Sequence, residues 1–153
     1  MSARATAVNS SVFGIVPLPG SSHAGGLTKP EIVTRAQLIN PDAEQSSGMQ
    51  RGQAFTHDGV WCGYATFPGG ANTGWHHHGD YATYSHITDG EILIEFGPGG
   101  GESVVARAGD AVYIPGNFVH RETVAPQGGA GFVVRTGGEG ATVHNVEGPD
   151  PAV

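Results

Sequence analysis

The sequence contains very little lysine and cysteine. Lys29 is its only lysine, and 7 basic residues against 14 acidic ones give a formal net charge of −7. Nucleic-acid-binding proteins present a basic surface, and many membrane-anchored proteins carry a polybasic segment, so both classes are disfavoured. The single cysteine, Cys62, excludes a disulfide within the chain and a zinc site built from cysteines.

Long hydrophobic runs are also missing. No stretch approaches the ~20 apolar residues needed to cross a membrane. The run Val12–Val16 is shorter than the apolar core of a secretory signal peptide, and Pro17 ends it. We therefore expect a cytoplasmic protein with no membrane partner.

Glycine and proline, in contrast, are abundant, with 26 glycines and 10 prolines among 153 residues. That content suits an all-β fold with many turns and argues against a helical bundle. Short β-favouring runs recur every ~8–12 residues between glycine and proline turns, which is the spacing of a β-sandwich or barrel. The run 91–96 shows a two-residue period, so Ile92, Ile94 and Phe96 are expected on its core side and Glu91 and Glu95 on its solvent side. The runs are 60–67, 82–88, 91–96, 103–106, 111–114, 119–125, 130–135 and 142–146.

The first third of the chain lacks this pattern. Residues 1–28 have no period and are rich in serine, alanine and glycine, so we expect an irregular N-terminal arm. Residues 31–34 are predicted as a short strand, followed by a linker with at most one helical turn. The expected division is an arm and linker over 1–50, a barrel over 51–148 and a tail over 149–153.

The most chemically informative segment is His76-His77-His78. In an extended chain, residues two apart share a face, so His76 and His78 can converge while His77 points away. His120, at the start of a predicted strand, is a third candidate. Three neutral imidazoles on one face of a closing sheet suit a divalent transition metal. The alternative is a cluster of surface histidines.

The residues around these histidines resemble two motifs of the cupin superfamily. Gly70-(x5)-His76-x-His78-(x4)-Thr83-(x6)-Gly90 resembles the first motif, and Gly109-(x5)-Pro115-x-Asn117-x-x-His120 resembles the second. The resemblance covers about residues 55–146 and implies a small cupin-type double-stranded β-helix, or jelly-roll, barrel. It also implies that His76, His78 and His120 hold one metal ion inside that barrel.

The sequence departs from the cupin pattern at three positions. Thr83 stands where most cupins carry a glutamate ligand, Asn117 replaces a glycine and Val124 replaces an asparagine. Asparagine also adopts left-handed turns, so the change at Asn117 is tolerable. Thr83 leaves three neutral ligands, as in the three-histidine cupins, which include thiol dioxygenases and a diketone-cleaving dioxygenase. This implies iron(II), dioxygen and a small anionic chelating substrate, although three imidazoles also accept Zn, Mn, Ni or Cu.

Two charged residues are candidates for handling such an anion. If strands 119–125 and 130–136 pair as a hairpin with Ala125 opposite Ala130, Arg135 lies opposite His120 and faces the cavity. Arg135 then clamps the anionic group of the substrate, and Glu122 is a catalytic base or orients the ligands. The alternative is a structural ion pair between Arg135 and Glu122.

Two hydroxyl residues complete the predicted pocket. Thr83 leaves a coordination position open to substrate, and Ser85 follows it on the same face of a strand. Both are predicted to line the substrate site, and the alternative for Ser85 is plain packing of the inner wall.

Three functions are therefore open at the level of the sequence. The first is a mononuclear iron(II) dioxygenase, and the second uses the same site with another divalent ion as a non-oxidative lyase or isomerase. The third is a non-catalytic cupin that binds a small ligand as a sensor or store. A homodimer is also expected, because cupin barrels commonly dimerise through outer strands and an exposed sheet edge favours being covered.

Overall fold

The computed structural model describes residues 30–39 and 48–150. The chain divides into two compact units, Met1–Pro30 and Glu31–Val153, and the fold is that of the second. The irregular arm predicted over residues 1–28 lies outside the described residues.

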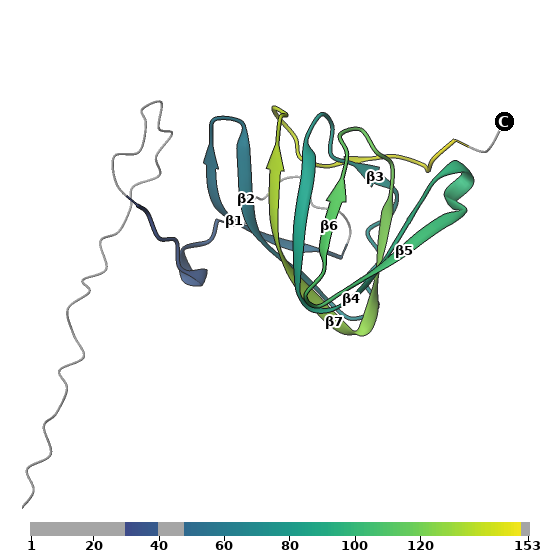
Figure 1. Ribbon diagram of the computed structural model, residues 1–153, viewed down its shortest axis with the longest axis horizontal. Helices are drawn as coiled ribbons and strands as arrows, with labels where there is room; N and C mark the ends of the chain where they lie inside the picture. Colours follow the sequence, from purple (N-terminus) through teal and green to yellow (C-terminus); the bar gives the residue numbers. More distant parts are fainter. Residues whose placement is uncertain (1–29, 40–47, 151–153) are drawn as a thin grey trace, which may run out of the picture. The chain divides into compact units, whose positions relative to one another are not determined.

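The second unit is built almost entirely of β-strands (Figure 1). Two single-turn 3-10 helices interrupt them, η1 (Arg35–Gln37) and η2 (Pro98–Gly100). Within the described ranges, no helix is long and apolar enough to span a membrane. The strands are β1 (Gln50–His57), β2 (Val60–Phe67), β3 (His76–His77), β4 (Ala82–Phe96), β5 (Glu102–Arg107), β6 (Ala111–Ile114), β7 (Arg121–Thr136) and β8 (His144–Asn145).

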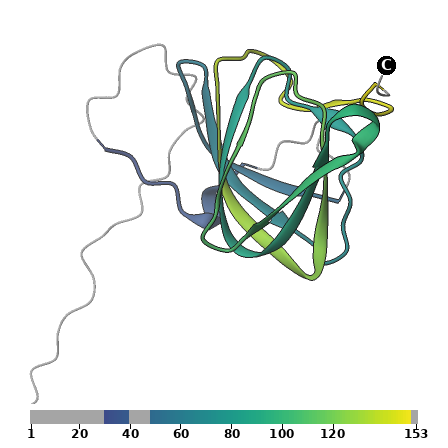
Figure 2. The same cartoon turned by 45° about the vertical axis from the view of Figure 1, so that its right-hand side comes forward.

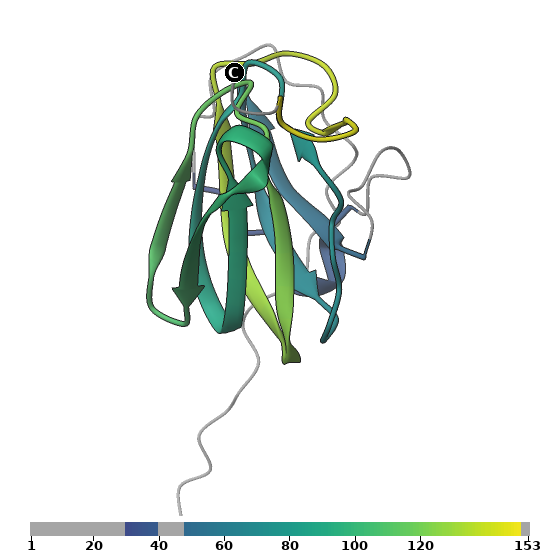
Figure 3. The ribbon, with the colours of Figure 1, turned by 90° about the vertical axis from the view of Figure 1, so that its right-hand side faces the viewer.

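Six of these strands form one antiparallel sheet. Its order is β1-β2-β7-β4-β5, with β6 paired to the first half of β4, while β3 and β8 form a separate pair. The longest strands, β4 and β7, pair from Ala82 opposite Thr136 to Glu95 opposite Arg121. Figures 2 and 3 show the strands curving around a common interior. The all-β jelly-roll predicted from the sequence is confirmed.

Both long strands bend at glycines, and these bends correct two predictions. The runs 82–88 and 91–96 belong to the single strand β4, whose pairing shifts on either side of residues 89–90. The runs 119–125 and 130–136 form the single strand β7, so the predicted hairpin is wrong. Gly90 (φ 77°) packs so closely on Gly128 (φ 84°) that a Cβ at Gly90 would collide with the Gly128 carbonyl oxygen. Residues 126–129 therefore bend beside β4 instead of reversing the chain.

The continuous strand also changes the predicted register of Arg135. Arg135 lies opposite Thr83 of β4 and Trp61 of β2, and not opposite His120. His120 instead forms an isolated bridge with His76.

The segment before β1 differs from its prediction as well. Residues 31–34 are not a strand, because the Thr34 backbone N–H and hydroxyl both donate to the Gln37 side-chain oxygen and stabilise the turn η1. Strand β1 has no counterpart among the predicted runs, and the run 142–146 is reduced to the two residues of β8.

The interior contains an apolar cluster and an unusually large set of buried polar side chains. Burying a polar group is costly unless it is paired, so such a set needs partners or a ligand. The apolar cluster comprises Met49, Trp61, Ala65, Phe67, Ile87, Ile92, Ile94, Ala106, Val124 and Val133. The buried polar residues are Arg51, Thr73, His76, His78, Thr83, His120 and Arg135.

Candidate metal centre and pocket

Three of the buried polar residues are the predicted metal ligands. His76 begins β3, His78 follows β3 and His120 immediately precedes β7, and all three are at most 2% exposed. Their ring centroids lie 4.4–5.1 Å apart, and one nitrogen from each ring falls within 4.8 Å of the others. Paired backbone hydrogen bonds of 2.9 Å between His76 and His120 fix two of the rings. The structure brings together the three histidines that the sequence singles out.

Backbone carbonyls determine which nitrogen each ring turns to the centre. The Nδ1 atoms of His76, His78 and His120 lie 2.8–3.1 Å from the carbonyl oxygens of Gly74, Thr142 and Phe118. A carbonyl can only accept, so each Nδ1 carries the proton and each Nε2 presents a lone pair. Among the residues that the structure describes, the buried Nε2 atoms of His76 and His120 have no hydrogen-bond partner. A divalent metal ion fits this donor set, because its ligands must be deprotonated and oriented by such outer contacts.

The buried environment also keeps His76 and His78 neutral. Burial lowers the pKa of His76 to about 4, because it outweighs the opposing charge of Glu122. Burial and the nearby charge of Arg135 lower the pKa of His78 as well. The lone pairs are therefore available to a metal ion at neutral pH.

A carboxylate lies beside two of these rings. One oxygen of Glu122 is 3.5 Å from His76 Nε2, and the other is 3.7 Å from His120 Nε2. Thr73 Oγ1, itself 2% exposed as a residue, donates to the first oxygen at 3.0 Å and accepts the Glu122 backbone N–H at 2.9 Å. Glu122 is thus held against the histidines, close to where the sequence predicts it.

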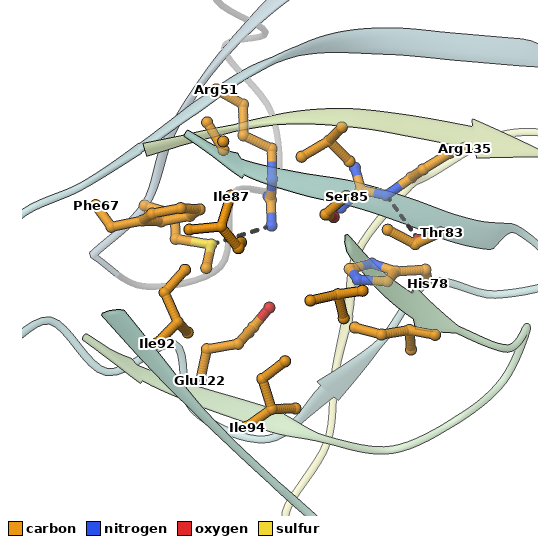
Figure 4. A pocket seen from close by; sticks show the side chains of 16 residues that line it. Arg51, Phe67, His78, Thr83, Ser85, Ile87, Ile92, Ile94, Glu122 and Arg135 are labelled. Atoms are coloured by element: carbon orange, nitrogen blue, oxygen red, sulfur yellow. Dashed lines mark hydrogen bonds between the residues drawn. The ribbon is translucent and has the colours of Figure 1, made fainter. Parts of the chain in front are cut away.

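The histidine site opens onto an internal pocket that has a cavity of about 40 Å³ (Figure 4). Its wall is mostly aliphatic, from both halves of β4 and from β2, β6 and β7. His78, Thr83, Ser85, Glu122, Arg51 and Arg135 supply its polar groups. An apolar wall with a few convergent polar groups is typical of a small-ligand site.

Two arginines line one side of this pocket. Arg135 is 2% exposed, its Nε donates to Thr83 Oγ1 at 3.3 Å, and its Nη1 is buried without a hydrogen-bond partner. Arg51 is 4% exposed and reaches the sulfur of Met49. Burial and the charge of Arg51 lower the pKa of Arg135 to about 9. Two buried guanidinium groups therefore lie on this side of the pocket.

The predicted pocket residues all line the cavity, although the argument for Arg135 rested on a wrong register. Arg135 faces inward because alternation along β7 places it on the same face as Val133. No ion pair joins it to Glu122 in the described residues, since Glu122 contacts the histidines instead. Sequence reasoning missed Arg51 because strand β1 was not predicted. The available signal was its position two residues after Met49, which is buried.

His77 and Asn117 adopt the orientations that the sequence predicts for them. His77 points away from the centre and stacks on His144 at 4.9 Å. Asn117 adopts the left-handed conformation (φ 56°) that the motif requires, and its amide donates to Asp80 at 2.8 Å. That contact ties the two motif loops together near the site.

The fold and the site define an all-β jelly-roll protein with three buried histidines positioned to bind a metal ion. Residues 63–130 match the family described as Cupin domain. The matched segment contains His76, His78 and His120. No curated protein sequence matches the chain.

Several solved structures share the fold at low sequence identity. An RmlC-like cupin from Shewanella frigidimarina matches with a TM-score of 0.58 and 20% identity, over 72% of this chain and 94% of that one. The polyketide cyclase RemF from Streptomyces resistomycificus matches with 0.63 and 18%, over 77% and 86%. KdgF from Halomonas sp. matches with 0.57 and 18%, over 72% and 97%. At these identities the similarity establishes the fold alone, because one barrel hosts many reactions.

Proposed function

We propose that this protein is a mononuclear divalent-metal enzyme, an oxygen-dependent dioxygenase that acts on a small anionic chelating substrate. The observation that supports this proposal is the meeting of three neutral imidazole lone pairs beside a small pocket lined by buried guanidinium groups. His76, His78 and His120 are the proposed ligands. Iron(II) is the favoured ion, with Zn, Mn, Ni or Cu chemically compatible.

The protein's own residues account for substrate orientation and water exclusion. When bound, iron(II) supplies the redox chemistry that joins dioxygen to an organic anion, and both oxygen atoms enter the product without an external reductant. Arg135 and Arg51 attract the anionic group through charge that is weakly screened in the interior. Thr83 and Ser85 form the polar wall between the arginines and the histidines, while the aliphatic wall limits the water near the reacting atoms.

The role of Arg135 can be tested apart from the metal. In metal-free protein, Arg135→Met should weaken the binding of oxalate and malonate about 10- to 100-fold, because hydrogen bonds to a charged group contribute about 1.5–3 kcal/mol. Its free energy of unfolding should stay the same or rise, since a buried unpaired charge is replaced by an apolar chain. Calorimetric titration and urea unfolding measure the two effects.

A matched control is Arg107→Gln, which removes an exposed arginine whose Nε contacts Glu91 at 2.8 Å on the outer surface. We expect this variant to bind both acids like the wild type. Unchanged binding in Arg135→Met would contradict the proposed anion site.

Oxygen dependence separates the dioxygenase from a lyase or isomerase. Protein reconstituted with iron(II) should consume one dioxygen per molecule converted when it meets its substrate in a panel of small acids, thiols and diketones. An oxygen electrode together with product mass measures this ratio. Turnover that persists under strict anaerobiosis would indicate the non-oxidative reaction, and binding without any chemical change would indicate a sensor or storage protein.

The homodimer and the cytoplasmic location stay predictions. The outer face of β4 and β6 carries Tyr84 and Tyr113, which are 50% and 58% exposed and have ring centroids 5.1 Å apart. Exposed aromatic side chains on adjacent strands favour association, so this face is where we expect the dimer to form.

A further inference from the structure

Glu122 is placed by strand geometry to face the metal centre. It lies two residues after His120 in the chain, so alternation directs both side chains to the same face. Its two carboxylate oxygens approach different histidines, at 3.5 Å from His76 Nε2 and 3.7 Å from His120 Nε2. The side chain is only 12% exposed. Water therefore screens this contact poorly.

This arrangement brings together groups that repel one another unless a cation lies between them. The Nε2 atoms present lone pairs, because both rings donate their Nδ1 protons to carbonyl groups. The carboxylate presents lone pairs too, and neither Nε2 atom has a hydrogen-bond partner in the described part of the chain. When the lone pairs of three such groups converge in a buried space, they either bind a metal ion or repel one another at a cost in folding free energy.

The separations from His76 and His120 are close to those of ligands around one ion, while the group whose ligand atoms all lie within 4.8 Å of one another comprises the three histidines without Glu122. Nitrogen and carboxylate ligands bind zinc-like ions at ~2.0–2.2 Å, so two of them in a tetrahedral shell lie about 3.3–3.6 Å apart. The two contacts of Glu122 fall at or near this range. A hydrogen bond between a protonated histidine and a carboxylate would be shorter, about 2.7–2.9 Å.

Thr83, which stands where most cupins carry a glutamate ligand, is hydrogen-bonded to Arg135. Thr83 Oγ1 accepts a hydrogen bond from Arg135 Nε, and its short side chain carries no charge. Glu122 has no such competing cation at hydrogen-bond distance in the described residues. Among the described residues, the side-chain hydrogen bond to this carboxylate comes from the Thr73 hydroxyl, which leaves further lone pairs on both oxygens.

We propose that Glu122 is the fourth protein ligand, so that the carboxylate missing from position 83 of β4 is supplied by β7. This inference rests on the proposed metal centre. It replaces the role of base that the sequence suggests for Glu122, because a carboxylate bound to a metal ion is a poor proton acceptor. Thr73 is then a positioning residue that aims one oxygen toward the ion. The centre carries one negative ligand, which lowers its net charge from +2 to +1.

The test is metal binding rather than turnover. Glu122→Gln keeps the shape of the side chain and removes its charge, so Co(II) and Zn(II) should bind at least about 100-fold more weakly, beyond the ~10–100-fold typical of outer-sphere changes. The visible absorption of bound Co(II) should also change, because that spectrum reports the ligands directly. The matched control is Glu95→Gln, which alters a glutamate paired with Arg121 on the outer surface and should change neither property.

Each outcome decides a different point. Wild-type protein that binds neither ion refutes the proposed metal centre itself. Wild-type affinity in Glu122→Gln, or weaker binding with an unchanged Co(II) spectrum, overturns the assignment of Glu122 and leaves the three-histidine centre standing. If the variant fails to fold, the structure of the Zn(II)-loaded wild type decides instead. We expect a Glu122 oxygen within about 2.0–2.2 Å of the ion, and one beyond the range of a bond overturns the proposal.

Discussion

His78→Ala is expected to lose stoichiometric metal while the β-sheet signal in circular dichroism stays largely intact. His78 supplies one of the three buried imidazoles, and the Thr142 carbonyl fixes its Nδ1, so its Nε2 is directed to the centre and is lost in the variant. Its backbone lies outside the main sheet, in the loop after β3, so removal of the ring leaves the pairing of β4 and β7 in place. The loss should be complete at micromolar metal.

The adjacent residue provides the control for this experiment. His77→Ala removes a histidine next in sequence that points outward and stacks on His144. Elemental analysis after dialysis should find about one metal ion per chain in the wild type and in His77→Ala, and none in His78→Ala. A His78→Ala protein that retains one ion per chain would show that the ligand assignment is wrong.

The alternation of side chains explains why so much of the site could be predicted. His76 and His78 converge and His77 diverges because successive residues of an extended chain face opposite ways. The same rule places Thr83 with Ser85 in the pocket wall, and buries Ile92 and Ile94. Glycine and proline spacing predicts β2, β5 and β6 closely, because turns interrupt the two-residue period at their ends.

The errors arise where pairing between distant strands decides the outcome. Residues 126–129 contain proline and glycine and resemble a hairpin turn, but β4 bends at the same level and keeps β7 continuous. No local signal reports that coincidence. Glu122 could be placed on the metal-facing side, whereas its contact with His76 depends on a bridge between chain segments more than 40 residues apart. Arg51 escaped notice because its strand alternates mostly polar residues.

The metal-free protein should lose stability between pH 6.5 and pH 4. His76 has a pKa of about 4 in the folded protein against 6.5 as the ordinary value, so the unfolded chain binds a proton in this interval that the folded chain does not. Stability rises with pH wherever the unfolded state binds more protons, so the contribution is complete above pH 6.5 and is lost as the pH falls toward 4. The difference corresponds to about 3 kcal/mol, and His78, whose pKa is also lowered, adds to the loss.

The groups facing His76 explain the size of this effect and supply its controls. Burial lowers its pKa most, His120 and Arg51 reinforce the shift by charge, and Glu122 opposes it.

Urea unfolding in the presence of a chelator should show the free energy of unfolding falling as the pH is lowered from 6.5 to 4. His76→Gln should flatten the dependence because it removes the titrating ring, whereas His77→Ala should leave most of it. Equal free energies for the wild type at pH 7 and pH 4.5 would contradict the prediction. Saturating Zn(II) should displace the loss to lower pH, since an ion bound only to the folded state competes with the proton for the same lone pairs.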